Sequence, residues 1–340
     1  MTAARPLPAR PQAKRPEHGF TLVELMVALT IGLLILLGLS VLFARNSGHM
    51  GEVEKVARQM ENGRYALDTL SSELRHAGYY GEFNPDNVGS LTWTTPDPCA
   101  TTIATMGWLT ALGNMQIPVA ITGTSGDTSR GCLPNRRADT AAVTVRFVNT
   151  GDELPRSAAT ATNLYAQVSS CNTDTVPVLV GSVPATFTLR NLACNAELDV
   201  IRRFITRTYY VASCNDCSPN DGIPTLKRVE FVNGELKITS IAEGVENLQL
   251  EYGLDTDNDG VVDEYLLPEQ VNGSGTRLWR NAIAARLHLL ARNTETTPGY
   301  TDPRTYTLGP GVTVRPADAF KRTLLTATLR LENVAARREQ

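Results

Sequence analysis

The chain has 340 residues, of which 42% are hydrophobic and 20% are charged, a composition that is ordinary for globular proteins. Its formal net charge is −3, but residues 1–19 hold four basic residues and one acidic residue, so residues 20–340 carry 28 basic and 34 acidic side chains. A mildly acidic body behind a short basic tail lacks the clustered positive charge of nucleic-acid-binding proteins. We therefore expect no nucleic-acid partner.

An apolar segment follows the basic tail. No charged residue occurs between Glu24 and Arg45, and the 20 residues between them would rise about 30 Å as a helix, which matches a bilayer core. The basic residues before the segment predict a cytoplasmic N-terminus and an exported C-terminal part. A secretory signal usually has a shorter apolar core, and a plain anchor does not explain the acid. A carboxylate within the membrane costs roughly 2.5–3.5 kcal/mol and usually marks a specific partner.

Residues 18–25, HGFTLVEL, resemble the class III signal of type IV pilins and type II secretion pseudopilins. The resemblance implies that a membrane prepilin peptidase cuts after Gly19, removes residues 1–19 as a leader, and methylates the new N-terminal Phe20. Glu24 would then pair with the terminal ammonium of a neighbouring subunit in a fibre. Such a pair is physically reasonable, because either charge alone is costly in a low-dielectric medium and the two attract strongly.

Past the membrane segment, apolar residues recur at alternating spacings of three and four. This pattern predicts an amphipathic helix over residues 45–78 that continues the transmembrane and assembly helix of residues 20–44. Gly78 is a plausible C-terminal stop. Gly48 and Gly51 are places where the helix could kink or break. The residues of the predicted stripe are Val53, Val56, Met60, Gly63, Leu67, Leu70 and Leu74.

Residues 79–340 read as a β-rich globular domain. Threonine, glycine and proline predict a loop-rich insert over about residues 85–200. Asn233-Gly234 between alternating apolar and polar runs predicts a hairpin. Because strands are many and helices few, we expect an α+β fold in which the long helix packs on an antiparallel sheet. The predicted strands are 142–148, 200–211, 226–238 with the hairpin at its centre, 245–252, 283–290 and 324–331.

Four stretches, which begin at Ser71, Ile241, Ile283 and Leu324, resemble the large minor pilins of the PilW type. The resemblance implies a pilin-like fold and a structural, non-enzymatic subunit. It would enter the inner membrane with its N-terminus cytoplasmic and its C-terminal domain periplasmic, and then join a type IV pilus at the cell surface, at or near the tip. The implied partners are prepilin peptidase, other minor pilins, the major pilin and a tip adhesin.

Two alternatives remain open at this point. The first is a type II secretion pseudopilin, which shares the same beginning but tends to be shorter. The second is a membrane-anchored periplasmic calcium-binding protein or enzyme that keeps its N-terminus. The gene neighbourhood would distinguish the first alternative, and the N-terminal residue of the membrane protein would distinguish the second.

An acidic loop follows the predicted strand 245–252. Its aspartates fall at positions 1, 3, 5 and 9 with Gly260 at position 6, the spacing of a calcium-binding loop. Leu266 replaces the glutamate usual at position 12, and strands flank the loop. Four like charges repel one another without a cation, although Asp, Asn and Gly are also ordinary turn residues. We expect no required cofactor and keep calcium as a candidate. Its candidate ligands are Asp255, Asp257, Asp259, Val261, Asp263 and Glu264.

Six cysteines, all beyond residue 98, suit disulfides in an oxidising compartment. The sequence Cys-Asn-Asp-Cys also has the spacing of a redox or half-zinc motif, but it follows a predicted strand and precedes a turn. No second such pair and no nearby histidine pair completes a zinc site. We therefore expect a structural disulfide there. Short spacing favours the pairs Cys99–Cys132, Cys171–Cys194 and Cys214–Cys217.

Overall fold

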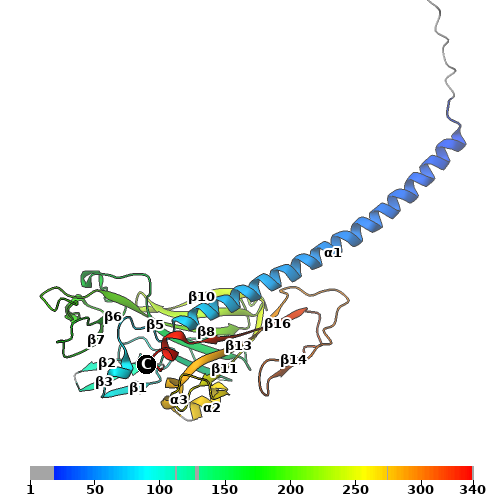
Figure 1. The fold of residues 1–340 in the computed structure, drawn as a ribbon. Helices are drawn as coiled ribbons and strands as arrows, with labels where there is room; N and C mark the ends of the chain where they lie inside the picture. The colour runs from blue at the N-terminus through cyan, green and yellow to red at the C-terminus, as the bar shows by residue number, and fades with distance from the viewer. Residues whose placement is uncertain (1–18, 112, 127–129, 274, 339–340) are drawn as a thin grey trace, which may run out of the picture. The chain divides into compact units, whose positions relative to one another are not determined.

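The structure is a computed structural model that describes residues 19–338, except residues 112, 127–129 and 274, and the side chains of 44–45, 48–49 and 276–277. The chain divides into two compact units, residues 1–53 and 54–340. A single helix, α1 (Leu22–His76), contributes to both units, and the rest of the second unit is mainly β-sheet (Figure 1). The fold is therefore α+β, as expected. Residues 1–18 of the predicted leader lie outside the described residues.

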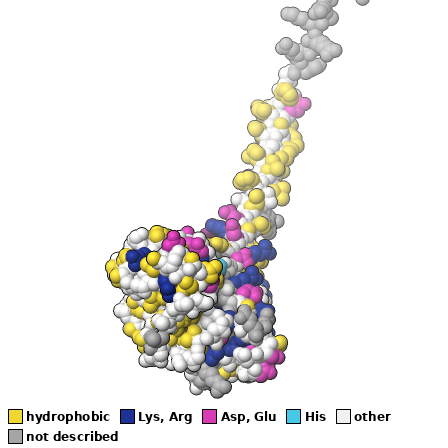
Figure 2. All heavy atoms as spheres, turned by 60° about the vertical axis from the view of Figure 1, so that its left-hand side comes forward, with side chains coloured by type: hydrophobic (Ala, Val, Ile, Leu, Met, Phe, Trp, Pro, Cys, Tyr) yellow, Lys and Arg dark blue, Asp and Glu magenta, His cyan; other side chains and the backbone are white. Residues whose placement is uncertain are grey.

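The first unit contains the apolar half of α1. Residues 22–43 have a mean hydropathy of 2.7 and enough length to cross a membrane, a test that a signal sequence also passes. Their apolar side chains are exposed on the helix surface (Figure 2). Neither Gly48 nor Gly51 interrupts the helix, so the break considered for these positions does not occur.

The part of α1 from Glu54 onward belongs to the second unit, and Gln59 is the first buried residue of this part. Leu70 and Leu74 are fully buried, whereas Val53 and Val56 are 70% and 38% exposed. The predicted stripe is therefore correct at its C-terminal end and wrong at its first two positions, because these precede the part of the helix that the sheets cover. Gln59, which the stripe omitted, is buried and donates from Nε2 to the Ala291 carbonyl at 2.9 Å.

Two antiparallel sheets form most of the second unit (Figure 1). The larger has seven strands, with the path β10-β9-β8-β5-β4 and with β6 and β7 attached through β8; the smaller has the order β12-β11-β13-β16. All predicted strands are present. Their bounds are β4 (Ile121–Ser125), β5 (Ala141–Val148), β6 (Tyr165–Val168), β7 (Val178–Gly181), β8 (Ile201–Ala212), β9 (Thr225–Val232), β10 (Glu235–Glu243), β11 (Val245–Leu254), β12 (Glu264–Leu266), β13 (Ala282–Arg292) and β16 (Arg322–Arg330).

The predicted loop-rich insert contains a small sheet of its own. In it β1 pairs in parallel with β3, and β2 pairs antiparallel with β3. A two-stranded ladder, β14 with β15, forms near the C-terminus. The remaining elements are β1 (Leu91–Thr94), β2 (Leu109–Ala111), β3 (Asn114–Pro118), β14 (Tyr306–Thr307), β15 (Thr313–Val314), α2 (Pro268–Gly273), α3 (Thr276–Arg280), α4 (Glu332–Ala335) and the 3-10 turns Pro85–Asn87, Arg156–Ala158 and Pro184–Thr186.

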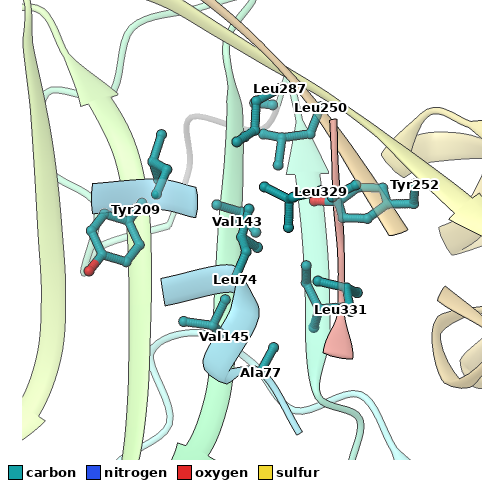
Figure 3. Packing of buried hydrophobic residues seen from close by; sticks show 14 of the residues in the cluster. Leu74, Ala77, Val143, Val145, Tyr209, Leu250, Tyr252, Leu287, Leu329 and Leu331 are labelled. Atoms are coloured by element: carbon teal, nitrogen blue, oxygen red, sulfur yellow. The ribbon is translucent and has the colours of Figure 1, made fainter. Parts of the chain in front are cut away.

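The main core lies where α1 meets both sheets (Figure 3). The close approach of α1 to β13 and β16 depends on Gly63. A Cβ atom at this position would lie 2.7 Å from Leu325 Cδ1 and 3.1 Å from Ala291 Cβ. Burial of so many aliphatic side chains, at about 25 cal/mol per Å² of apolar surface, is the main force that holds this half of α1 on the sheets. Core residues labelled in the figure are Leu74, Ala77, Val143, Val145, Tyr209, Leu250, Tyr252, Leu287, Leu329 and Leu331.

The C-terminal segment closes the end of α1. Gly78, the predicted stop, has a φ of 77°, and its amide donates to the Arg146 carbonyl at 2.9 Å. Asn333 Nδ2 donates to the Arg75 carbonyl at 2.9 Å, and Arg337 Nη1 donates to the Gly78 carbonyl at 2.9 Å. Carbonyl groups that the helix end leaves without intrahelical partners are thus satisfied by residues from the far end of the sequence.

A buried ion cluster anchors the segment between β13 and β16. The side chain of Asp302 is fully buried and accepts bonds from Arg304 Nε at 3.0 Å and Tyr306 Oη at 2.8 Å. Burial alone would raise the pKa of Asp302, but these bonds outweigh it and hold that pKa below its ordinary value. Arg322, also buried, lies 3.6 Å from the Asp302 carboxylate and 2.5 Å from that of Glu246.

Candidate functional site

The start of α1 brings Thr21 and Glu24 together in a capping box. The Thr21 amide and hydroxyl both donate to Glu24 Oε2 at 2.9 Å, and the Glu24 amide donates to Thr21 Oγ1 at 3.2 Å. Such reciprocal bonds satisfy amides that a helix N-terminus otherwise leaves unpaired. The spacing Thr-x-x-Glu is the sequence signal of this arrangement, which was not among the predicted features.

The capping box leaves part of the Glu24 carboxylate available. Both bonds that the carboxylate accepts use Oε2, and among the described residues Oε1 accepts none. Gly19 and Phe20 precede the helix, and Phe20 is 89% exposed. The predicted cleavage bond therefore lies in a non-helical, accessible stretch directly before a carboxylate with a free oxygen.

The acidic loop between β11 and β12 gathers three of its four aspartates. Single carboxylate oxygens of Asp255, Asp257 and Asp263 lie within 4.8 Å of one another. Backbone amides organise the loop: Asn258 and Gly260 donate to the two oxygens of Asp255, at 2.6 and 3.0 Å. The Thr256 hydroxyl and amide each donate to Asp263 at 2.7 Å and hold its pKa below the ordinary value.

The carboxylates of Asp259 and Glu264 are not part of this group of three. Asp259 accepts the Val261 amide at 2.8 Å instead. Glu264 pairs with Leu254 in the β11–β12 ladder. Val261 was a candidate through its backbone carbonyl, which stays a prediction. Within the described part of the chain the cluster of potential metal-binding acids therefore comprises Asp255, Asp257 and Asp263, without Asp259 and Glu264.

A cation from the protein itself already lies at the loop. Arg338 Nη1 is 3.4 Å from Asp255 Oδ2 and donates to the Asp255 carbonyl at 3.2 Å, while Nη2 donates to Asn281 Oδ1 at 2.7 Å. Asp255 is fully buried, so this ion pair offsets much of the cost of burying its charge. The sequence alone gave no sign of this contact, which joins residues far apart in the chain.

All six cysteines are paired in three disulfides, and the pairs are those that short spacing favoured. Cys214–Cys217 lies in the connection between β8 and β9 and begins directly after a strand, as expected. Cys214 is fully buried and Cys217 is partly exposed. The Lys227 ammonium, which is also buried, donates to Cys217 Sγ at 3.6 Å.

Family models match two parts of the chain. Residues 208–333 match type IV pilus-assembly protein W, the PilW family, and residues 14–40 match the prokaryotic N-terminal methylation motif. The chain therefore contains a PilW domain and a prokaryotic N-terminal methylation motif. That domain extends from within β8 to α4, and the methylation motif includes the capping box.

The PilW-domain chain also resembles a protein of known structure. Among solved structures, it is similar to a type IV-like pilin from Thermus thermophilus, with 12% identity and a TM-score of 0.33, over 82% of this chain and 97% of the other. No curated protein matches it.

Proposed function

We propose that this pilin-like protein is a minor pilin, a structural and assembly-priming subunit located at or near the tip of a type IV pilus. The observation that carries the proposal is the arrangement at the start of α1, within the matched methylation motif. There, an accessible Gly19-Phe20 bond precedes a carboxylate that is held by Thr21 and has one free oxygen. The PilW domain supports the assignment to the pilus.

In this proposal prepilin peptidase removes residues 1–19 and the new N-terminal Phe20 is methylated. The cut creates an ammonium group four residues before Glu24. Because Oε2 is already bound to Thr21, Oε1 is the oxygen that accepts the ammonium of a neighbouring subunit. The pairing neutralises two charges that would each be costly in the apolar surroundings of packed helices. The capping bonds keep the carboxylate oriented before the ammonium of the neighbouring subunit binds.

The proposed route starts in the inner membrane, with the N-terminus cytoplasmic and the second unit periplasmic, and ends in the fibre at the cell surface. The apolar span of residues 22–43 would pack against the corresponding helices of other minor pilins and the major pilin. A tip adhesin is a further proposed partner. The role is structural and not enzymatic, because the features that carry it are packing surfaces and one ion pair.

N-terminal analysis of the protein extracted from membranes tests this proposal. We expect mass spectrometry to find a chain that begins at N-methylated Phe20. The matched control is Gly19→Val, which should keep its leader in the same cells, because the β-branched side chain blocks the cleavage position. A wild-type chain that begins at Met1 or Thr2 would overturn the pilin assignment and favour a membrane-anchored protein of another class.

A type II secretion pseudopilin is the second candidate. The length of the chain and its large insert, which carries two of the three disulfides, favour the pilus over this alternative. Co-purification from detergent-solubilised membranes distinguishes the two: recovery of pilins supports the proposal, and recovery of secretion-system components supports the pseudopilin.

We also propose calcium as an optional ligand of the acidic loop. The closeness of three carboxylates supports binding, since oxygen ligands suit this ion. The Arg338 guanidinium opposes it, because it already neutralises Asp255. Isothermal titration of the full chain in detergent measures the balance, with Asp257→Asn as the matched variant. No heat at millimolar calcium in the wild type, or equal heat in the variant, rejects the site.

A further inference from the structure

The connection between β8 and β9 combines a short disulfide with a buried cation. Lys227, on β9, donates from Nζ to the Asn215 carbonyl at 2.9 Å and to Cys217 Sγ at 3.6 Å. Only 8% of Lys227 is exposed. An ammonium held this way stabilises a thiolate on the neighbouring sulfur much more than a thiol or a disulfide. The arrangement therefore favours chemistry that releases negative charge at Cys217.

The two sulfurs of this disulfide differ in access. Cys214 is fully buried, whereas Cys217 is partly exposed, so an external thiolate reaches the Cys217 side first. The Ser213 hydroxyl lies 3.8 Å from Cys214 Sγ, where it can donate to a buried leaving thiolate. We propose that Cys214–Cys217 is a thiol–disulfide exchange site that accepts a thiol reductant at Cys217, with Lys227 as the positioning residue for the Cys217 thiolate. This inference is independent of the proposed role in the pilus.

A dithiol reductant supplies both electrons that the exchange requires. One thiolate of the dithiol attacks Cys217 Sγ, the sulfur–sulfur bond breaks, and Cys214 leaves as a thiolate that takes up a proton. The second thiol of the reductant, once deprotonated, attacks the first, closes the oxidised ring, and releases Cys217 as a thiolate beside Lys227. Two electrons pass from the dithiol to the protein. In the reverse direction Cys217 is the attacking thiolate and Cys214 the resolving thiol.

Other charged groups around the loop are already engaged. Asp221 accepts the amides of Asn215 at 3.0 Å and Asp216 at 2.7 Å, and burial, which would raise its pKa, is outweighed by such bonds so that its pKa is lowered. The Asp216 carboxylate accepts the Ser218 amide at 3.1 Å. Two further side chains contact the loop from neighbouring elements: Glu243 accepts from Asn215 Nδ2, and Arg292 donates to the Gly222 carbonyl. Lys227 is the cation in direct contact with the sulfur.

Cys171–Cys194 provides an internal comparison. It too joins a buried cysteine to a partly exposed one. Its sulfurs contact neutral groups, with Cys171 Sγ 3.1 Å from Thr173 Oγ1 and Cys194 Sγ 3.8 Å from Asn172 Oδ1. The loop it closes is longer, with a sequence separation of 23 against 3 for Cys214–Cys217. The longer loop restrains more of the unfolded chain. Reduction of Cys171–Cys194 should therefore destabilise the protein more than reduction of Cys214–Cys217.

Graded reduction of the full chain in detergent tests the proposal. The protein is treated with increasing dithiothreitol, alkylated, and mapped by peptide mass spectrometry. We expect Cys214 and Cys217 to be labelled before Cys171 and Cys194, while near-ultraviolet circular dichroism stays native. Labelling of Cys171 and Cys194 first, or simultaneous labelling of all six cysteines on unfolding, would overturn the proposal.

A second measurement separates the effect of Lys227 from the effect of loop length. In the selectively reduced protein, the alkylation rate of Cys217 is followed against pH. We expect the midpoint in Lys227→Met to rise by about one pH unit, a tenfold loss of thiolate at fixed pH, and Lys227→Arg to restore the wild-type midpoint. Equal midpoints in the wild type and Lys227→Met would show that Lys227 only holds the loop, and would refute its proposed role.

Discussion

Replacement of Leu74 by alanine tests how the amphipathic half of α1 is held. Leu74 is fully buried and belongs to the same core cluster as Val143 and Val145 of β5 and Leu331 (Figure 3). The change removes three carbon atoms from a site enclosed by strands that are each paired in a sheet, so the surroundings collapse little. Leucine-to-alanine changes at such sites cost 2.7–5.0 kcal/mol, and we expect about 3–4 kcal/mol here. In a unit of this size that lowers the melting temperature by roughly 10 °C.

Val56→Ala is the matched control on the same helix. Val56 belonged to the predicted apolar stripe but is 38% exposed, so its truncation should change stability by less than about 0.5 kcal/mol. Urea unfolding of the full chain in detergent, followed by near-ultraviolet circular dichroism, measures both variants against the wild type. A loss below about 1 kcal/mol for Leu74→Ala, or equal losses for the two variants, would refute the packing described for α1.

Three further predictions concern other parts of the molecule. Glu24→Ala should leave leader cleavage normal and reduce incorporation into sheared fibres about tenfold or more, because removal of one member of a desolvated pair costs well over 1.4 kcal/mol; wild-type incorporation on immunoblots would contradict this. Asp302 has a lowered pKa, so its contribution is complete above about pH 4 and is lost as pH falls through the folded-state pKa. Asp302→Asn should therefore lower the melting temperature at pH 7 more than at pH 3. Equal decreases at both pH values would count against a stabilising role for the ionised Asp302 carboxylate. Gly63→Val should cost about 1–3 kcal/mol through overpacking against β13 and β16, and unfolding at the wild-type urea concentration would show that the interface has room.

Local patterns in the sequence were sufficient for much of the fold. Alternation of apolar and polar residues located the six main strand regions, although β5 and β11 are buried on both faces. Asn233 and Gly234 do form the β9–β10 turn, and both have positive φ values, 53° and 85°, which these residue types tolerate. Gly78 ends α1 for the same reason. These features depend on residues that are close together in the sequence.

Features that depend on distant residues could not be predicted in this way. The exposure of Val56 is set by where the sheets begin to cover α1. The parallel pairing of β1 with β3 joins short strands whose threonine-rich sequences show no sustained alternation. Arg338 contacts Asp255 across 83 positions, and no spacing rule connects them. The capping box is different from these features, because the spacing Thr21-x-x-Glu24 is a local signal that the sequence contains.

The closure of α1 by the C-terminal segment has a consequence for how the protein is made. Asn333 and the carbonyl that it binds on Arg75 are separated by 258 positions, so the helix is synthesised long before the residues that complete its end. At typical translation rates of about 5–20 residues per second, this interval lasts on the order of ten seconds or more. Throughout it, the end of the helix lacks the side chains that later bind the Arg75 and Gly78 carbonyls. A stop at codon 331, 332 or 333 would therefore leave a chain that contains both sheets but lacks the Asn333 that binds the end of α1.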